Sequence, residues 1–110
     1  MRTGVKHGHA AYYYENGALK ESGNYVNNKK HGLWKTWNKK GILVSTIPYK
    51  VGEKHGSGSL FHDNGIQKMT MTYDKNAKVG TWISYNEKGD FLKKTVYKKY
   101  KDELFFTLRL

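Results

Sequence analysis

The sequence lacks cysteine, contains a single proline and has only 37% apolar residues in a chain of 110. Without cysteine no disulfide can form, so thiol chemistry gives no information on the compartment. No apolar run approaches the roughly 18 residues of a membrane-spanning helix. A chain of this length and composition is expected to form one domain with a thin core.

Negative charge is also scarce, because 9 acidic residues stand against 20 basic ones and leave a formal net charge of +11. This excess favours an anionic partner, which could be nucleic acid, an anionic lipid surface or an acidic protein. The alternative is that lysine only keeps an open sheet soluble and guards its edges. The N-terminal stretch MRTGVKHGHA lacks the apolar core of a signal peptide, which favours a cytoplasmic location.

What the sequence does contain is an internal repeat of 24 residues. The tripeptide Lys6-His7-Gly8 returns at this spacing as Lys30-His31-Gly32 and in two later copies. A second glycine, a tyrosine and a Gly/Asn position recur in step, without insertion or deletion, and define units 6–29, 30–53, 54–77 and 78–101. The columns are Gly8, Gly32, Gly56 and Gly80; Gly17, Gly41, Gly65 and Gly89; Tyr25, Tyr49, Tyr73 and Tyr97; and Gly4, Asn28, Gly52 and Asn76.

Each unit reads as a β-hairpin. The second glycine follows turn-forming residues, as in Glu15-Asn16-Gly17, and supplies the positive φ of a hairpin turn. The Gly/Asn column fits the turn to the next unit for the same reason. The segments between turns, 33–38 and 42–51 in the second unit, are too short for ordinary helices. The prediction is an all-β, elongated, single-layer antiparallel meander of four hairpins.

Aromatic residues fall into one column, which predicts a stack along the array. Such neighbours contribute about 0.2–1 kcal/mol per cross-strand pair, and the stability of the array is expected to come from contacts between units. Pro48 lies within a predicted strand, where its missing N–H implies a bulge or an unpaired position. The column consists of Tyr13, Trp37, Phe61 and Tyr85.

The two ends depart from the repeat. Residues 103–110 alternate between apolar and other residues, which predicts a capping strand over the last unit. A helix through Val96, Tyr100 and Leu104 is the alternative. Residues 1–4 align with the last third of a preceding unit, so either the array begins abruptly or the chain is a piece of a longer one.

Catalytic and metal chemistry find little support in the repeat columns. His7, His31 and His55 share one column, but equivalent positions in successive hairpins lie roughly 9–10 Å apart, too far to share a zinc ion. These histidines are expected to cover the turn beside the glycine. Carboxylates are scattered over several columns and no serine lies in a G-x-S-x-G elbow. We expect no enzyme, no metal and no cofactor.

The candidate binding residues include two tryptophans in a repeat column that is not filled by tryptophan in every unit. Trp34 and Trp82 share a column that holds Ala10 and Gly58 in the other units. A uniform core would fill this column throughout, so both tryptophans are predicted to contact a partner. The alternative is that they pack beneath long lysine stems. The residues predicted to meet an acidic partner are Lys93, Lys94, Lys98 and Lys99.

A glycine, an aromatic a few residues on, a turn Asn-Gly, a later tyrosine and a closing Gly/Asn-Lys-x-Gly resemble the MORN-repeat variant family, over residues 4–97. Bacterial members of the family include proteins labelled YwqK-like antitoxins. The resemblance implies an elongated sheet of successive hairpins, a scaffold role in contacts with proteins or membrane lipids, and no catalytic residue set.

The function expected from the sequence is a non-enzymatic scaffold that binds another protein, with an antitoxin-like role as one form of this. Anionic lipid is one alternative, since lysine clusters suit diffuse electrostatic attraction. Nucleic acid is the other, although arginine, which favours bidentate phosphate contacts, is present only as Arg2 and Arg109. Self-association through the open sheet edges is left open by the sequence.

Overall fold

The computed structural model describes residues 4–97 and 104–109, and within them it contains strands and turns but no helix. The predicted all-β class is therefore confirmed. The strands are β1 (Gly8–Tyr13), β2 (Leu19–Val26), β3 (Lys29–Trp37), β4 (Leu43–Lys50), β5 (Glu53–Lys54), β6 (Gly56–Phe61), β7 (Gln67–Asp74), β8 (Ala77–Lys78), β9 (Gly80–Tyr85), β10 (Phe91–Tyr97) and β11 (Leu104–Arg109).

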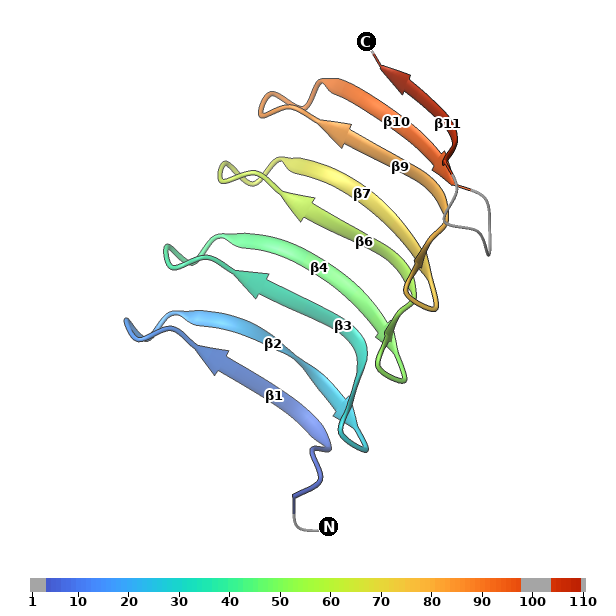
Figure 1. Ribbon diagram of the computed structural model, residues 1–110. Coiled ribbons are helices and arrows are strands. Elements are labelled where there is room, and N and C mark those ends of the chain that lie inside the picture. The colour runs from blue at the N-terminus through green and yellow to red at the C-terminus, as the bar shows by residue number, and fades with distance from the viewer. Residues whose placement is uncertain (1–3, 98–103, 110) are drawn as a thin grey trace.

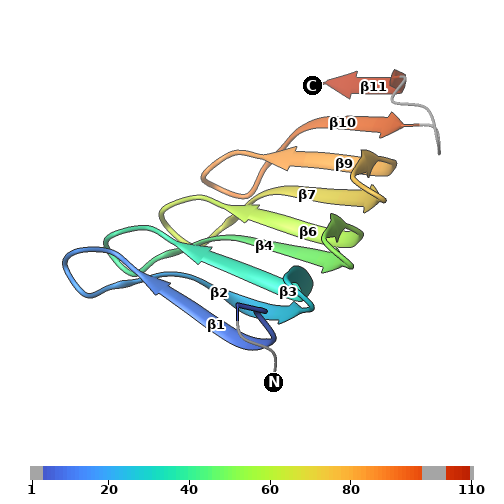
Figure 2. The ribbon, with the colours of Figure 1, turned by 60° about the horizontal axis from the view of Figure 1, so that its bottom comes forward.

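Every long strand lies beside its neighbour in the chain, in the order β1-β2-β3-β4-β6-β7-β9-β10-β11, and all pairs are antiparallel (Figures 1 and 2). The short strands β5 and β8 pair with β4 and β7. The molecule measures 51 × 35 × 15 Å, which confirms the predicted elongated single layer. The described residues contain no helix long and apolar enough to cross a membrane.

The turn within each hairpin takes the glycine that the sequence places there. In the first unit the Gly17 N–H donates to the Tyr14 carbonyl at 3.0 Å, and Gly17 has φ +88°. This is the three-residue loop in which a type I turn ends on a left-handed residue. The equivalent glycines have φ +84°, +87° and +90°, so the predicted role of the column is confirmed at Gly41, Gly65 and Gly89.

The turn between hairpins requires a left-handed conformation at two successive residues, not one. Asn27 and Asn28 have φ of 49° and 71°, and Val51 and Gly52 have φ of 48° and 83°. This pattern is a two-residue type I′ turn. Val51 is the exceptional residue, because a β-branched side chain is strained at positive φ. Its side chain is 57% exposed and so gains little from burial.

Replacing Val51 with asparagine, the residue at the equivalent position 27, is expected to stabilise the fold. Asparagine tolerates the left-handed region, so the free energy of unfolding should rise by about 1 kcal/mol. Chemical denaturation measures the change. Val26→Asn is the control, since Val26 is an exposed strand residue without positive φ and should not gain stability. A Val51→Asn variant no more stable than the parent would contradict this prediction.

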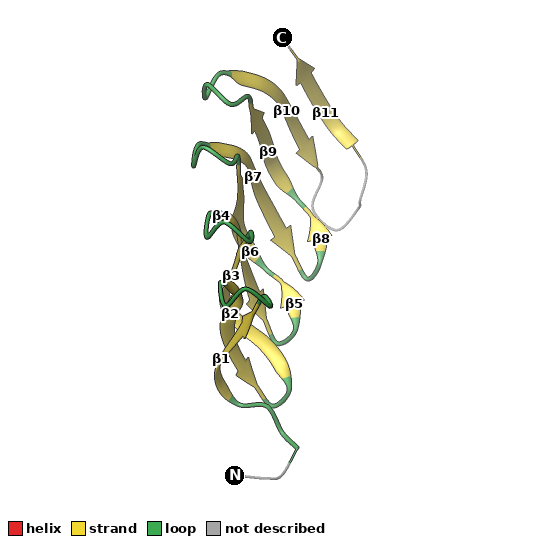
Figure 3. Ribbon diagram, turned by 90° about the vertical axis from the view of Figure 1, so that its left-hand side faces the viewer, coloured by secondary structure: helices red, strands yellow, loops and turns green. Residues whose placement is uncertain are grey.

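A bulge separates each hairpin from the next. Between β4 and the following strands, the register passes from Thr46↔Ser59 to Tyr49↔Lys54, so two residues on one strand oppose four on the other. The chain bends at this point, and Figure 3 shows β5 and β8 turned away from the plane of the longer strands. Pro48 lies in the bulge and accepts a hydrogen bond from the His55 N–H at 3.0 Å, which confirms the predicted irregularity.

The C-terminal strand also follows the sequence. β11 pairs antiparallel with β10, for example at Thr95↔Thr107, so the predicted capping strand is confirmed. The alternative was a helix through Val96, Tyr100 and Leu104. Val96 and Leu104 lie in strands, which contradicts it at these two positions, and Tyr100 lies outside the described residues.

The core lies on one face of the sheet. We call it the aromatic face, defined by Tyr25, Trp34, Tyr73 and Trp82, whose rings meet at centroid distances of 5.0 Å (Tyr25–Trp34) and 5.1 Å (Tyr73–Trp82) in edge-to-face geometry. The predicted stack of the Tyr13 column is wrong in its residues, because no ring pair within that column is found in the described residues. Its members are separated by two strand spacings, which exceeds the reach of ring contact.

Candidate functional site

Both tryptophans that the sequence singles out are buried. Trp34 is 2% exposed and Trp82 is 9% exposed. The Trp34 indole N–H donates to the Asn24 carbonyl at 3.0 Å, and the Trp82 indole N–H donates to the Thr72 carbonyl at 3.1 Å. A direct contact with a partner would require exposed indoles, and these two are not exposed. Their geometry is that of the alternative, in which both tryptophans pack beneath lysine stems. A direct contact between either indole and a partner stays a prediction.

Lysines cover these rings. Lys30 Nζ lies 4.6 Å from the centroid of Trp34 and 5.1 Å from that of Tyr49. The first lysine of each unit takes the same position over the tyrosine that closes its unit, at 5.0 Å, 5.1 Å and 5.8 Å in the other three. The aliphatic stem of each lysine thus shields an aromatic ring, and the face of that ring attracts the ammonium group. The other three pairs are Lys6–Tyr25, Lys54–Tyr73 and Lys78–Tyr97.

The space around the tryptophan column is filled differently in different units. A Cβ placed on Gly23 would lie 2.2 Å from Trp34 Cδ2, so the indole occupies the space that a side chain at position 23 would need. In the third unit the column holds Gly58, and Met71, 4% exposed, fills the space beside it. The core is therefore continuous although the column is not, because neighbouring strands supply the missing volume.

Replacing Gly23 with alanine should lower the free energy of unfolding by about 1–3 kcal/mol, since the buried indole of Trp34 has little room to move. Chemical denaturation measures this, with Ser22→Ala on the other face as the control. Adding Trp34→Phe should recover part of the loss. A Gly23→Ala variant as stable as the parent would show that the indole does not fill this space.

The predicted lysines lie in different places. Lys93 joins Trp82 at a pocket on the aromatic face, whereas Lys94, its neighbour in β10, points to the opposite face. Lys98 and Lys99 lie outside the described residues. The structure thus brings together two of the predicted residues, Trp82 and Lys93, and separates them from Trp34 and Lys94.

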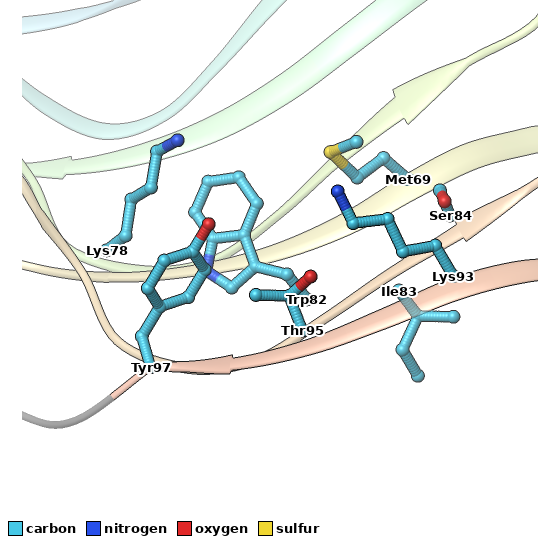
Figure 4. A pocket seen from close by; sticks show the side chains of 8 residues that line it. All are labelled: Met69, Lys78, Trp82, Ile83, Ser84, Lys93, Thr95 and Tyr97. Carbon is cyan, nitrogen blue, oxygen red and sulfur yellow. The ribbon is translucent and has the colours of Figure 1, made fainter. Parts of the chain in front are cut away.

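The pocket has a volume of about 200 Å³ and lies between β7, β9 and β10. Figure 4 shows Trp82 between the two lysines of the pocket, Lys78 and Lys93, with Ile83 pointing away. No carboxylate is among its lining residues, and no carboxylate of the described residues is within salt-bridge distance of either lysine. The lining consists of Met69, Lys78, Trp82, Ile83, Ser84, Lys93, Thr95 and Tyr97.

The histidines of the KHG tripeptides do not assemble. His55 Nδ1 lies 3.3 Å from an oxygen of Asp74, while His7 and His31 are exposed. Within residues 4–97 and 104–109, no cluster of three or more His, Cys, Asp or Glu side chains has the geometry to hold a metal ion.

At the other end of the sheet, the Tyr12 and Tyr25 hydroxyls form a hydrogen bond of 3.1 Å in which either can donate. This hydrogen bond is the main cause that raises the pKa of Tyr25 to about 12, followed by burial and nearby negative groups that include Glu21. Burial also raises the pKa of Tyr73, which lies beneath Lys54. Neither phenol is set to ionise near neutral pH, so neither acts as a base there.

Because the pKa of Tyr25 in the fold, about 12, exceeds the ordinary value of 10.0, its contribution to stability is complete below pH 10 and is lost as the pH rises toward 12. Tyr12→Phe should remove most of this loss. Denaturation between pH 10 and pH 12 measures the loss of stability, with Tyr13→Phe as an exposed control. In Tyr12→Phe, tyrosinate absorbance should show the Tyr25 phenol titrating closer to its ordinary pKa. Parallel pH profiles for the parent and Tyr12→Phe would contradict the assignment.

A family of known proteins matches part of the chain. A family model described as MORN repeat variant matches residues 6–27 and 30–50, which span the hairpins β1–β2 and β3–β4. These two segments are MORN-variant repeats. No curated protein matches the sequence. MORN-variant repeats are generally associated with contacts to proteins and membranes and are typically non-enzymatic scaffolds.

Sequence reasoning missed two features of the MORN-variant units. It left the first lysine of KHG without a role, although its recurrence in all four units was visible. It also missed the residues that differ between units at the pocket. Positions 21, 45 and 47 hold Glu, Ser and Ile, and their counterparts two units on are Met69, Lys93 and Thr95. A comparison of alternate units, rather than of all four, would have revealed that difference.

Proposed function

We propose that this chain is a non-enzymatic interaction module that binds an acidic protein across its aromatic face. The observation that carries the proposal is the row of lysines at positions 6, 30, 54 and 78, held over aromatic rings on one face. Ring contact restrains each lysine stem, so less conformational entropy is lost when a partner arrives. A partner with acidic side chains beside apolar ones complements both the ammonium groups and the rings.

Charge alone would also attract an anionic membrane or nucleic acid. The ammonium groups are not matched by carboxylates except at Lys30, which lies 3.3 Å from an oxygen of Glu21, within the described residues. A bound protein, however, uses fixed aromatic and charged contacts, and its binding weakens less with salt than binding to a diffuse polyanion does. An antitoxin-like role is the narrower form of the proposal, in which the acidic partner is a toxin.

The test is capture from a lysate of the source organism at about 50 and about 300 mM salt. We expect one acidic protein at both salts, with loss in Lys54→Gln/Lys78→Gln but not in Lys35→Gln/Lys94→Gln, which removes equal charge from the other face. Thermal melting verifies that all variants fold. Equal loss in both double variants would contradict the aromatic face as the binding surface.

A parallel measurement uses vesicles of phosphatidylcholine with and without phosphatidylserine, and a single-stranded oligonucleotide. Under the proposal these bind only at the lower salt. Tight binding to either probe at both salts, without a captured protein, would overturn the proposal in favour of a lipid or nucleic-acid binder.

A further inference from the structure

The pocket beside Trp82 differs from the equivalent place two repeat units earlier, beside Trp34. There Lys30 is neutralised by Glu21, at 3.3 Å. Lys78 is the counterpart of Lys30, but the counterpart of Glu21 is Met69, which carries no charge. A second lysine, Lys93, stands where the earlier unit has Ser45. The same framework thus holds a neutral site in one place and two ammonium groups in the other.

A threonine that is largely buried lines part of the pocket. Thr95 is 5% exposed and lines the pocket, and its column holds only Gly23, Ile47 and Met71 in the other units. Among residues 4–97, none is hydrogen-bonded to the Thr95 side chain, whereas the hydroxyl groups of Thr36 and Ser45 near Trp34 bond each other. A hydroxyl at a position that is otherwise apolar adds a hydrogen-bonding group to the wall of the pocket.

We propose that this pocket binds the carboxylate of an aspartate or glutamate side chain presented by the acidic partner. Lys78 and Lys93 flank the carboxylate from two sides, and the Thr95 and Ser84 hydroxyls can each donate a hydrogen bond to it. The Trp82 ring and Met69 contact the aliphatic part of the side chain. This assignment rests on the proposed function, and it identifies the residue type that the partner inserts.

The lining favours a carboxylate over a phosphate group. Two hydroxyls and two ammonium groups can donate to both oxygens of a carboxylate. Two ammonium charges would suit phosphate as well, so the preference for a carboxylate rests on the apolar part of the lining. Arginine, which gives bidentate contacts to phosphate, is not among the lining side chains that the structure describes. A pocket of about 200 Å³ with a methionine and an indole in its wall suits a short side chain with methylene groups.

The direct test is NMR titration of the full chain with the blocked peptide acetyl-Ala-Glu-Ala-amide. The glutamine peptide and inorganic phosphate are the comparison probes. We expect saturable shifts of the Trp82 indole N–H and the Thr95 amide with the glutamate peptide, and about tenfold weaker binding of the glutamine peptide. Equal binding of the two peptides, absence of shifts at these residues, or preferential binding of phosphate would each overturn the proposal.

Two variants, each with a matched control, locate the effect. Lys93→Ser restores the residue of the earlier unit, and Met69→Glu restores its carboxylate beside Lys78. Each should weaken binding of the glutamate peptide about tenfold, because one charge-assisted contact is lost or already satisfied. Met69→Gln, of equal size but neutral, and Lys35→Ser, on the opposite face, are the matched controls. Binding by Lys93→Ser and Met69→Glu that equals binding by the parent would overturn the proposal.

The two proposals fail in different ways. If a protein is captured through the aromatic face and Lys93→Ser does not weaken it, the interaction module stands and the pocket is not its carboxylate site. If the peptide binds the pocket but no acidic protein is captured, the carboxylate site stands and the proposed function fails.

Discussion

A sheet that forms a single layer has no second layer to cover its aromatic rings, and this constraint governs the structure. The rings must be covered by side chains of the same sheet. Here an indole from one hairpin lies against the preceding hairpin, as Trp34 does over Gly23, and a lysine stem closes it from above. The core is therefore distributed along the array, and neighbouring units depend on one another for their burial.

The same constraint gives the positive charge two roles. The first lysine of each unit belongs to the interior through its stem and to the surface through its ammonium group. Covering the rings therefore places a row of cations on one face. Around Trp34 a carboxylate from Glu21 balances the local lysine, while around Trp82 the sequence adds Lys93 instead. Small changes on a repeated framework thus convert a structural position into a candidate binding site.

The sequence was informative where one residue type has one physical use. Glycines such as Gly17 predicted their turns because a left-handed conformation selects glycine. The sequence was uninformative at Val51, because valine rarely adopts the left-handed conformation that the residue has here. The burial of Trp34 and Trp82 was named only as the alternative, because one column was considered alone. Their cover comes from other strands, across bulges whose register no local pattern discloses.

The most direct test of this account is hydrogen exchange of the three indole N–H groups in the parent protein. Those of Trp34 and Trp82 donate to backbone carbonyls beneath the lysine cover, while that of Trp37 has no acceptor among the described residues. The account predicts that Trp34 and Trp82 exchange at least about tenfold more slowly than Trp37. Equally fast exchange at all three would contradict the buried, lysine-covered core and return both tryptophans to the surface.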